Sequence, residues 1–212
     1  MIKYPVRSLM NIAAAFLSIA GAVILIVEAS HATAWHIVSF SIYALSLIAL
    51  WSVSAVYHTL NAQNLVLEQL DHAMIYFLIA GTYTPVCLIV LKGGWGWSLF
   101  GINWTLAIAA IVLHLVFRNL KRWAVVLFFI LYLVMGWLIV VAWFPLVRAL
   151  PSGGMFWLVL GGCFYTFGTI AFGLKHLKFS AYFGAHEIWH LFVMAGSFSH
   201  YWLMFKYVMT VR

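Results

Sequence analysis

Seven long apolar stretches divide the sequence, and short polar or Gly- and Pro-containing segments separate them. Each stretch holds about 20 residues, the length at which an α-helix crosses the ~30 Å hydrocarbon core of a membrane. This alternation predicts an all-α fold, an integral membrane bundle of seven transmembrane helices. The predicted spans are residues 8–27, 36–58, 70–91, 97–117, 123–143, 154–174 and 185–207.

The composition favours the same class of protein. Hydrophobic residues make up 67% of the chain and charged residues 7%, whereas a soluble domain carries about 25% charged residues. Because the spans fill the 212 residues, we expect a single membrane domain over residues 1–212. The net charge of +7 does not indicate a nucleic-acid partner, since the Lys and Arg residues sit singly or in small groups between apolar runs. The expected partners are membrane lipids.

The N-terminus allows a second interpretation. Lys3 and Arg7, an apolar stretch and the sequence Ala32-Thr33-Ala34 are similar to a secretory signal peptide with its cleavage site. Signal-peptide cores are about 7–15 residues long, and this apolar stretch is longer. We therefore expect a retained first helix.

The loop charges predict the orientation of the bundle, because Lys and Arg accumulate in cytoplasmic loops. With a cytoplasmic N-terminus, four positive residues face outward and seven face inward. The inward residues are Lys3, Arg7, Arg118, Lys121, Arg122, Lys175 and Lys178. The sequence thus predicts an inside N-terminus and an outside C-terminus.

Ionisable residues in or beside membrane spans are costly and indicate function. Asp71, the only aspartate, begins the third span; His58 ends the second, with Ser54 one turn earlier; His186 and His190 open the seventh. The end of an even-numbered span and the start of an odd-numbered span lie on the same side of the membrane. These residues therefore share one depth, and on the charge count that depth is the cytoplasmic leaflet.

Three imidazoles at one depth are typical of a divalent-metal site, and zinc takes three protein ligands plus water where it is catalytic. His58, His186 and His190 are the candidate ligands. The Asp71 carboxylate is placed to hold the metal-bound water or to orient a ligand. The Ser54 hydroxyl is placed to donate to the water or to a substrate oxygen. We therefore expect Zn²⁺ as cofactor.

The remaining histidines carry less weight. His200 lies fourteen residues beyond His186, about 21 Å deeper along a helix, and is not expected in the site. His114 and His176 have no partner at helical spacing and are interpreted as interfacial. His72 points about 100° away from its neighbour Asp71 and is an outside candidate.

The sequence His186-Glu187-Ile188-Trp189-His190 also matches the H-E-x-x-H signature of zinc metalloproteases, in which the glutamate is the base. An intramembrane protease is therefore an alternative. The extended signature needs a glycine and a third histidine where this chain has Val193 and Gly196. The plainer interpretation of Glu187 is an interfacial carboxylate beside a ligand.

Three segments together resemble the hemolysin III family, the bacterial branch of the progestin and adipoQ receptor superfamily. They are Ser54-x-x-x-His58, the block from Asp71-His72 to Gly81-Thr82-Tyr83-Thr84-Pro85, and His186-x-x-x-His190. The resemblance implies a seven-helix bundle in the bacterial inner membrane with zinc near the cytoplasmic face. It maps the zinc ligands onto the three histidines, places Asp71 beside the metal-bound water and puts Ser54 close by.

One departure from the family pattern concerns the first helix. An acidic residue followed by a His-Gly pair is expected there, whereas this chain offers only Asn11 after Arg7. A second point concerns Pro85, which removes a backbone hydrogen bond within the third span and frees the Gly81 carbonyl. Either the resulting kink opens room for an acyl chain, or Thr82 and Thr84 bond the freed carbonyl.

Two classes of function follow. Eukaryotic members of the superfamily are linked to ceramide hydrolysis, so the first hypothesis is a zinc-dependent hydrolase of a lipid amide or related membrane substrate. In it, zinc polarises the substrate and Asp71 accepts a proton. The second hypothesis is a non-enzymatic receptor, homeostasis regulator or haemolytic pore in which the zinc is structural.

Overall fold

The computed structural model describes residues 4–60, 65–116, 122–174, 178–180 and 183–211, with the backbone alone for 122–125. Helices account for nearly all of these residues, and no β-strand occurs among them. The elements are α1 (Pro5–Ala29), α2 (Ala34–Thr59), α3 (Leu65–Pro85), η1 (Val86–Leu91), α4 (Gly93–Val116), α5 (Arg122–Trp137), η2 (Leu138–Ala142), α6 (Trp143–Ala149), α7 (Ser152–Gly173), α8 (Ala185–Leu203) and η3 (Met204–Val208).

Six helical segments of the described chain are long and apolar enough to cross a membrane. They confirm the all-α membrane class, and the first of them is a continuous α1 of 25 residues. Helix α8 is not among the six, because His186, Glu187, His190 and His200 lower its mean hydropathy. The seventh crossing therefore stays a prediction.

Helices extend beyond the predicted spans at two places. Residues 144–153, which separate the predicted fifth and sixth spans, contain most of α6, and α6 follows η2 directly. Pro145 does not prevent this helix, because it lies in the first turn, where a missing N–H costs little. Helix α3 begins at Leu65, five residues before the predicted start.

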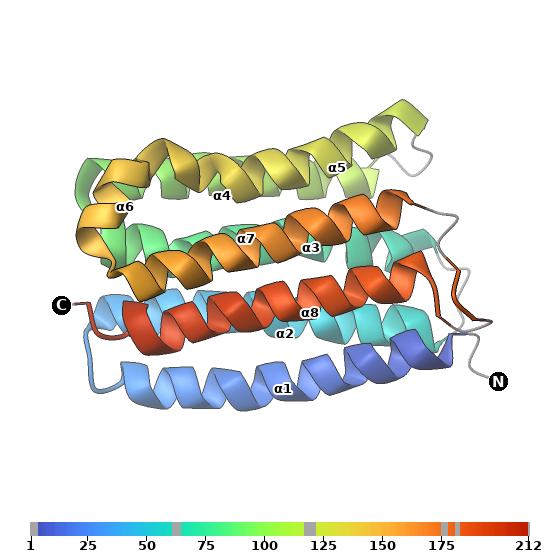
Figure 1. Cartoon of the computed structure of the whole chain (residues 1–212), viewed down its shortest axis with the longest axis horizontal. Helices are drawn as coiled ribbons and strands as arrows, with labels where there is room; N and C mark the ends of the chain where they lie inside the picture. The colour runs from blue at the N-terminus through green and yellow to red at the C-terminus, as the bar shows by residue number, and fades with distance from the viewer. Residues whose placement is uncertain (1–3, 61–64, 117–121, 175–177, 181–182, 212) are drawn as a thin grey trace.

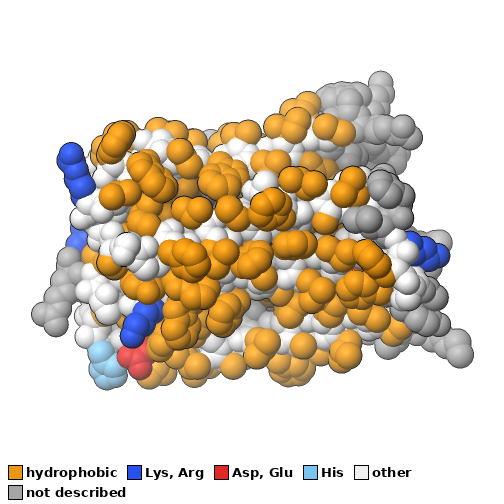
Figure 2. Space-filling view, in the orientation of Figure 1, with side chains coloured by type: hydrophobic (Ala, Val, Ile, Leu, Met, Phe, Trp, Pro, Cys, Tyr) orange, Lys and Arg blue, Asp and Glu red, His pale blue; other side chains and the backbone are white. Residues whose placement is uncertain are grey.

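The helices run side by side (Figure 1). Helix α1 packs on α2 and α8, α3 packs on α2 and α4, and α7 packs on α8. Large apolar side chains such as Leu9 and Phe144 are exposed on the outside. Figure 2 shows this apolar cover along the length of the bundle, with Lys and Arg at its two ends. Such a surface suits hydrocarbon around the sides and water at the ends.

Small residues allow the helices to approach closely. A Cβ atom at Gly81 of α3 would lie 2.1 Å from the Ser46 hydroxyl oxygen of α2. A Cβ atom at Gly161 of α7 would lie 2.3 Å from the His200 ring of α8. Close packing over small residues replaces hydrophobic burial as the source of helix association in a membrane.

Pro85 is followed directly by the π-helix η1, in which the Lys92 N–H bonds the Cys87 carbonyl. The hydroxyls of Thr82 and Thr84 donate to the carbonyls of Leu78 and Ala80. One of the two interpretations of Pro85 required these threonines to bond the Gly81 carbonyl, and neither of them does. The proline marks a change of helix type.

Candidate metal centre

Three histidine rings meet at the end of the bundle where α2 ends and α8 begins. His58 lies in the last turn of α2, while His186 and His190 occupy the first two turns of α8. The ring centroids are 5.2 Å apart for His58 and His186, 5.1 Å for His58 and His190, and 4.9 Å for His186 and His190. One ligand atom from each ring lies within 4.8 Å of the other two. The predicted convergence of these residues is confirmed.

The donor set fits a divalent metal ion. The Nε2 atoms of His58 and His190 are buried and have no hydrogen-bond partner among the described residues, and an unpaired buried polar atom carries a free-energy cost. Zinc bonds of about 2.0–2.1 Å place nitrogen ligands roughly 3.4 Å apart. The ligand atoms of the three histidines lie within 4.8 Å of one another, and an ion bound between them would satisfy the unpaired nitrogens.

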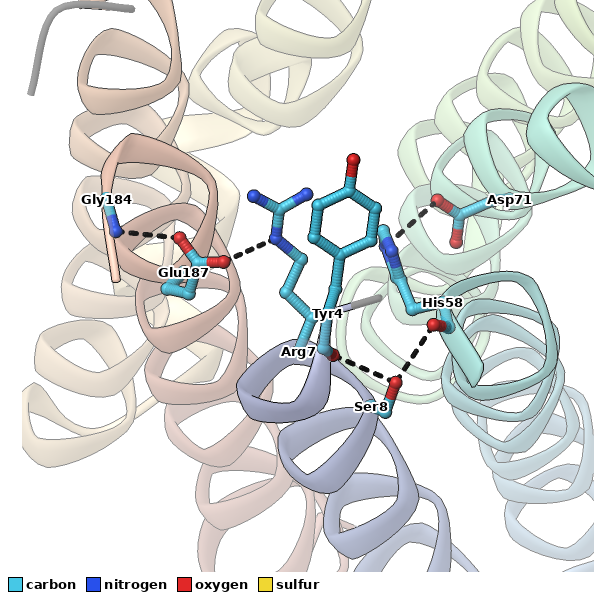
Figure 3. Close-up of polar contacts among 7 residues, drawn as sticks. All are labelled: Tyr4, Arg7, Ser8, His58, Asp71, Gly184 and Glu187. Carbon is cyan, nitrogen blue, oxygen red and sulfur yellow. Dashed lines mark hydrogen bonds and ion pairs between the residues drawn. The ribbon is translucent and has the colours of Figure 1, made fainter. Parts of the chain in front are cut away.

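Asp71 and Ser54 lie beside the histidines, as the sequence predicted. The Asp71 Oδ2 atom is 4.0 Å from the His58 Nε2 atom, and Figure 3 shows the carboxylate directed at that ring. Ser54 is buried in α2, one turn before His58. A carboxylate and a hydroxyl therefore stand next to the candidate ligands, although their chemical roles stay predictions.

A cavity runs from this cluster into the bundle. Its empty space is about 1140 Å³, counting the open mouth. Helices α2, α3, α5, α7 and α8 line it; Asp71, His186 and His190 are at one end, and His200 contributes further along α8. Most of the wall is apolar or aromatic, which is typical of a site for a small apolar ligand.

Comparison with known proteins decides the family. The sequence profile described as "Haemolysin-III related" matches residues 3–201. The chain is 40% identical to Hemolysin-3 of Bacillus cereus over 200 residues, which covers 92% of this chain and 87% of the relative. It is also 40% identical to the Hemolysin-3 homolog of Bacillus subtilis over 92% of this chain and 89% of the relative. The chain belongs to the haemolysin III family.

A more distant similarity extends beyond bacteria. The chain is 29% identical to the human monocyte to macrophage differentiation factor, over 82% of this chain and 72% of the relative. The haemolysin III protein is a multi-pass integral membrane protein, and its bacterial relatives agree with the expected location in the bacterial inner membrane. The family resemblance inferred from the sequence motifs is confirmed.

The glutamate of the H-E-x-x-H sequence has structural partners in this haemolysin III protein. Glu187 is 3% exposed and accepts hydrogen bonds from Arg7 Nε and, at 2.7 Å, from the Gly184 N–H (Figure 3). The second bond caps the N-terminus of α8. Glu187 is therefore buried in the protein, and both of its carboxylate oxygens are engaged by protein donors, which weakens the protease alternative.

Sequence reasoning missed the contribution of α1 to the site. The Ser8 hydroxyl donates to the His58 carbonyl at 2.9 Å. The Tyr4 ring packs edge-on against His58, with 6.5 Å between centroids, and the Arg7 guanidinium lies 4.3 Å from the centroid of the Tyr4 ring. One turn further along, Asn11 is fully buried and its side-chain atoms have no partner among the described residues.

The other histidines also differ from their sequence interpretation. His114 is buried, and its ring packs against His72 with 5.5 Å between centroids, so it has a partner that helical spacing did not indicate. His200 stays outside the metal cluster, as expected, but lines the same cavity. His176 lies outside the described residues. Contacts between α3 and α4 brought the His72–His114 pair together, and no helical spacing signals such a pair.

Proposed function

We propose that this haemolysin III protein is a metal-dependent membrane hydrolase acting on a lipid amide or a related lipid. The observation that carries the proposal is the cluster of His58, His186 and His190 at the end of an apolar cavity, with Asp71 beside it. A zinc ion bound there would supply a Lewis acid and acidify water near neutral pH.

The side chains around the cluster have complementary roles in this proposal. Asp71 Oδ2 takes up a proton as the nucleophile forms and returns it to the leaving group, as a general base and acid does. Ser54 lines the same cavity as Asp71, and its hydroxyl donates to the Asp71 carboxylate or to a substrate oxygen. The apolar residues of the cavity hold the hydrocarbon chain and exclude bulk water from the reacting bond.

A second candidate function is a non-enzymatic receptor or regulator in which the metal only joins α2 to α8. The burial of the His58 and His190 Nε2 atoms supports it, because structural metal sites are closed to solvent. The cavity at Asp71, His186 and His190 favours the hydrolase, since a purely structural ion needs no space beside it for a substrate.

The proposed topology has seven crossings with the N-terminus in the cytoplasm. The combined segment of α8 and η3 covers residues 185–208 without interruption, about 36 Å at 1.5 Å per residue, and a hydrocarbon core is ~30 Å thick. Five of the residues used for the charge count, Lys3, Arg118, Lys121, Lys175 and Arg212, lie outside the described residues. In this topology the metal centre lies in the cytoplasmic leaflet.

Metal content and turnover of the purified full-length protein test the proposal together. Wild type is expected to retain close to one zinc per chain and to hydrolyse a long-chain lipid amide. His190→Ala should lose the metal, whereas Asp71→Asn should retain it and lose about 10²–10⁴-fold in turnover. The exposed His31 serves as control, and His31→Ala should match wild type.

The outcomes separate the candidates. Metal bound at one per chain without turnover of any lipid amide or ester would favour the structural role. A wild-type protein with well below one metal per chain would refute the metal centre itself.

A further inference from the structure

We infer that the first turn of α1 is a brace that positions the three histidines for metal binding, although it supplies no ligand. This inference rests on the metal centre of the proposed function. Arg7 and Ser8 are adjacent in sequence, yet Arg7 bonds to α8 and Ser8 bonds to α2. Figure 3 shows this turn lying between the two elements that carry the histidines.

Arg7 links α1 to α8 through its contact with Glu187. The Arg7 side chain is 18% exposed and the Glu187 side chain is 4% exposed, so the ion pair is largely withdrawn from water. Removing one partner of such a pair leaves an uncompensated charge, which is costly. Glu187 follows His186 directly, and its second oxygen holds the Gly184 N–H. Arg7 therefore ties α1 to the turn of α8 that presents the ligands.

Ser8 links α1 to α2 through its hydrogen bond to the His58 carbonyl. His58 lies in the last turn of α2, where backbone carbonyls have no donor within their own helix. The Ser8 hydroxyl supplies that donor at 2.9 Å. Tyr4 packs against the His58 ring and is itself held by the Arg7 guanidinium. The backbone and the ring of one ligand thus both contact the brace.

A metal centre requires this precision because its ligands come from two separate helices. The ligand atoms lie within 4.8 Å of one another, and productive geometry tolerates errors of about 0.5 Å. A small slide of α8 along α2 would separate His58 from the other two rings. Helix α1 packs against both α2 and α8, so its first turn is placed to prevent that slide.

Cobalt binding to the purified full-length protein tests the brace, because the visible absorption of Co²⁺ reports ligand geometry directly. Arg7→Met should weaken Co²⁺ binding by about 10–100-fold, the loss typical of residues that orient metal ligands, and should alter the absorption bands. Arg7→Lys should recover part of the affinity. Arg148 of α6 is far along the chain from the site and provides the control Arg148→Met, for which no change is expected.

Ser8→Ala provides a milder test in case Arg7→Met does not fold. It should weaken Co²⁺ binding by a few-fold, while Ser18→Ala should not, because the Ser18 hydroxyl bonds a carbonyl of its own helix. Wild-type affinity and an unchanged spectrum in folded Arg7→Met and Ser8→Ala would overturn the brace alone. A wild-type protein that binds no metal would instead overturn the proposed metal centre, and the brace with it.

Discussion

At the scale of single residues, Gly81 decides how closely α3 approaches α2. The space that a side chain would need is taken by Ser46, whose oxygen lies 2.1 Å from the position of an added Cβ atom and whose own Cβ lies 2.6 Å from it. Ser46 cannot simply turn away, because its hydroxyl donates to the Tyr43 carbonyl at 2.7 Å in a buried environment. Gly81 therefore sets the spacing of the helices that carry Asp71 and His58.

Replacing this glycine should destabilise the protein. We expect Gly81→Ala to lower the free energy of unfolding by about 1–3 kcal/mol, the usual cost of overpacking. Thermal unfolding in detergent measures the effect. Gly101→Ala in α4 is the matched control, because nothing lies within 4 Å of its added Cβ and alanine favours a helix. Equal melting temperatures for the two variants would contradict the expected overpacking.

The residues of the metal centre were partly predictable. His58, Asp71, His186 and His190 could be placed together because depth in a membrane depends only on the order of the spans. The pair of Arg7 and Glu187 could not, since the two residues are 180 positions apart and neither belongs to a motif for such a contact. The contact of His114 was missed for the same reason, as its partner His72 lies on another helix.

At the scale of elements, the first turn of α8 carries both a candidate metal ligand, His186, and the residue that caps the helix, Glu187. Glu187 satisfies the Gly184 N–H at the start of the helix and Arg7 of α1 at the same time. A carboxylate at this position also interacts favourably with the positive end of the helix dipole. Glu187 in this turn therefore binds the backbone at the start of α8 and also the neighbouring helix α1.

Substitutions of Glu187 should therefore change stability more than chemistry. Glu187→Ala loses both contacts and should cost at least about 1–2 kcal/mol, the value of a cap alone. Glu187→Gln has one acceptor oxygen instead of two, so its melting temperature should lie between those of Glu187→Ala and wild type. The exposed Glu28 gives the control Glu28→Ala, which should melt as wild type does.

Turnover distinguishes this role from that of a protease base. With metal in excess, Glu187→Gln should turn over a lipid amide within a few-fold of wild type. A loss of 10²-fold or more, comparable to that of Asp71→Asn, would instead support catalysis by Glu187.

The elements themselves followed the apolar pattern closely, with differences where local chemistry changes the helix. The predicted span 36–58 lies within α2 at Ala34–Thr59, and the predicted span 154–174 matches α7 at Ser152–Gly173. The π-helices η1 and η3 were not predicted, because hydrophobicity does not distinguish a π-helix from an α-helix. The extension through α6 was missed because Pro145 was read as part of a connection.

At the scale of the whole molecule, the two ends of the bundle differ. The candidate metal centre, the start of α1 and the start of α8 lie together at one end, and the chain passes from α3 and η1 to α4 at the other. Figure 1 shows the N-terminus and the C-terminus at opposite ends, as an odd number of crossings requires. The orientation of these ends across the membrane is open to a direct measurement.

Cysteine labelling tests the proposed topology. In a chain with Cys87 and Cys163 replaced by alanine, a cysteine at Gly94 or at the exposed Thr210 should react with an impermeant maleimide in intact cells. A cysteine at Phe179, which is 68% exposed, should react only in inverted vesicles. Reactivity of Thr210→Cys on the same side as Phe179→Cys would show that α8 does not cross, and reversal of all three would show the opposite orientation.

The contact between Arg7 and Glu187 also has a consequence for the order in which the protein assembles. The two residues are 180 positions apart, and ribosomes add about 5–20 residues per second. Roughly 10–40 s therefore separate the synthesis of the two partners. During that interval Arg7 at the start of α1 has no Glu187 to bind, and His58 has neither His186 nor His190 beside it. The helix that is made first receives its final neighbour last, so the three histidines come together only late in the assembly of this protein.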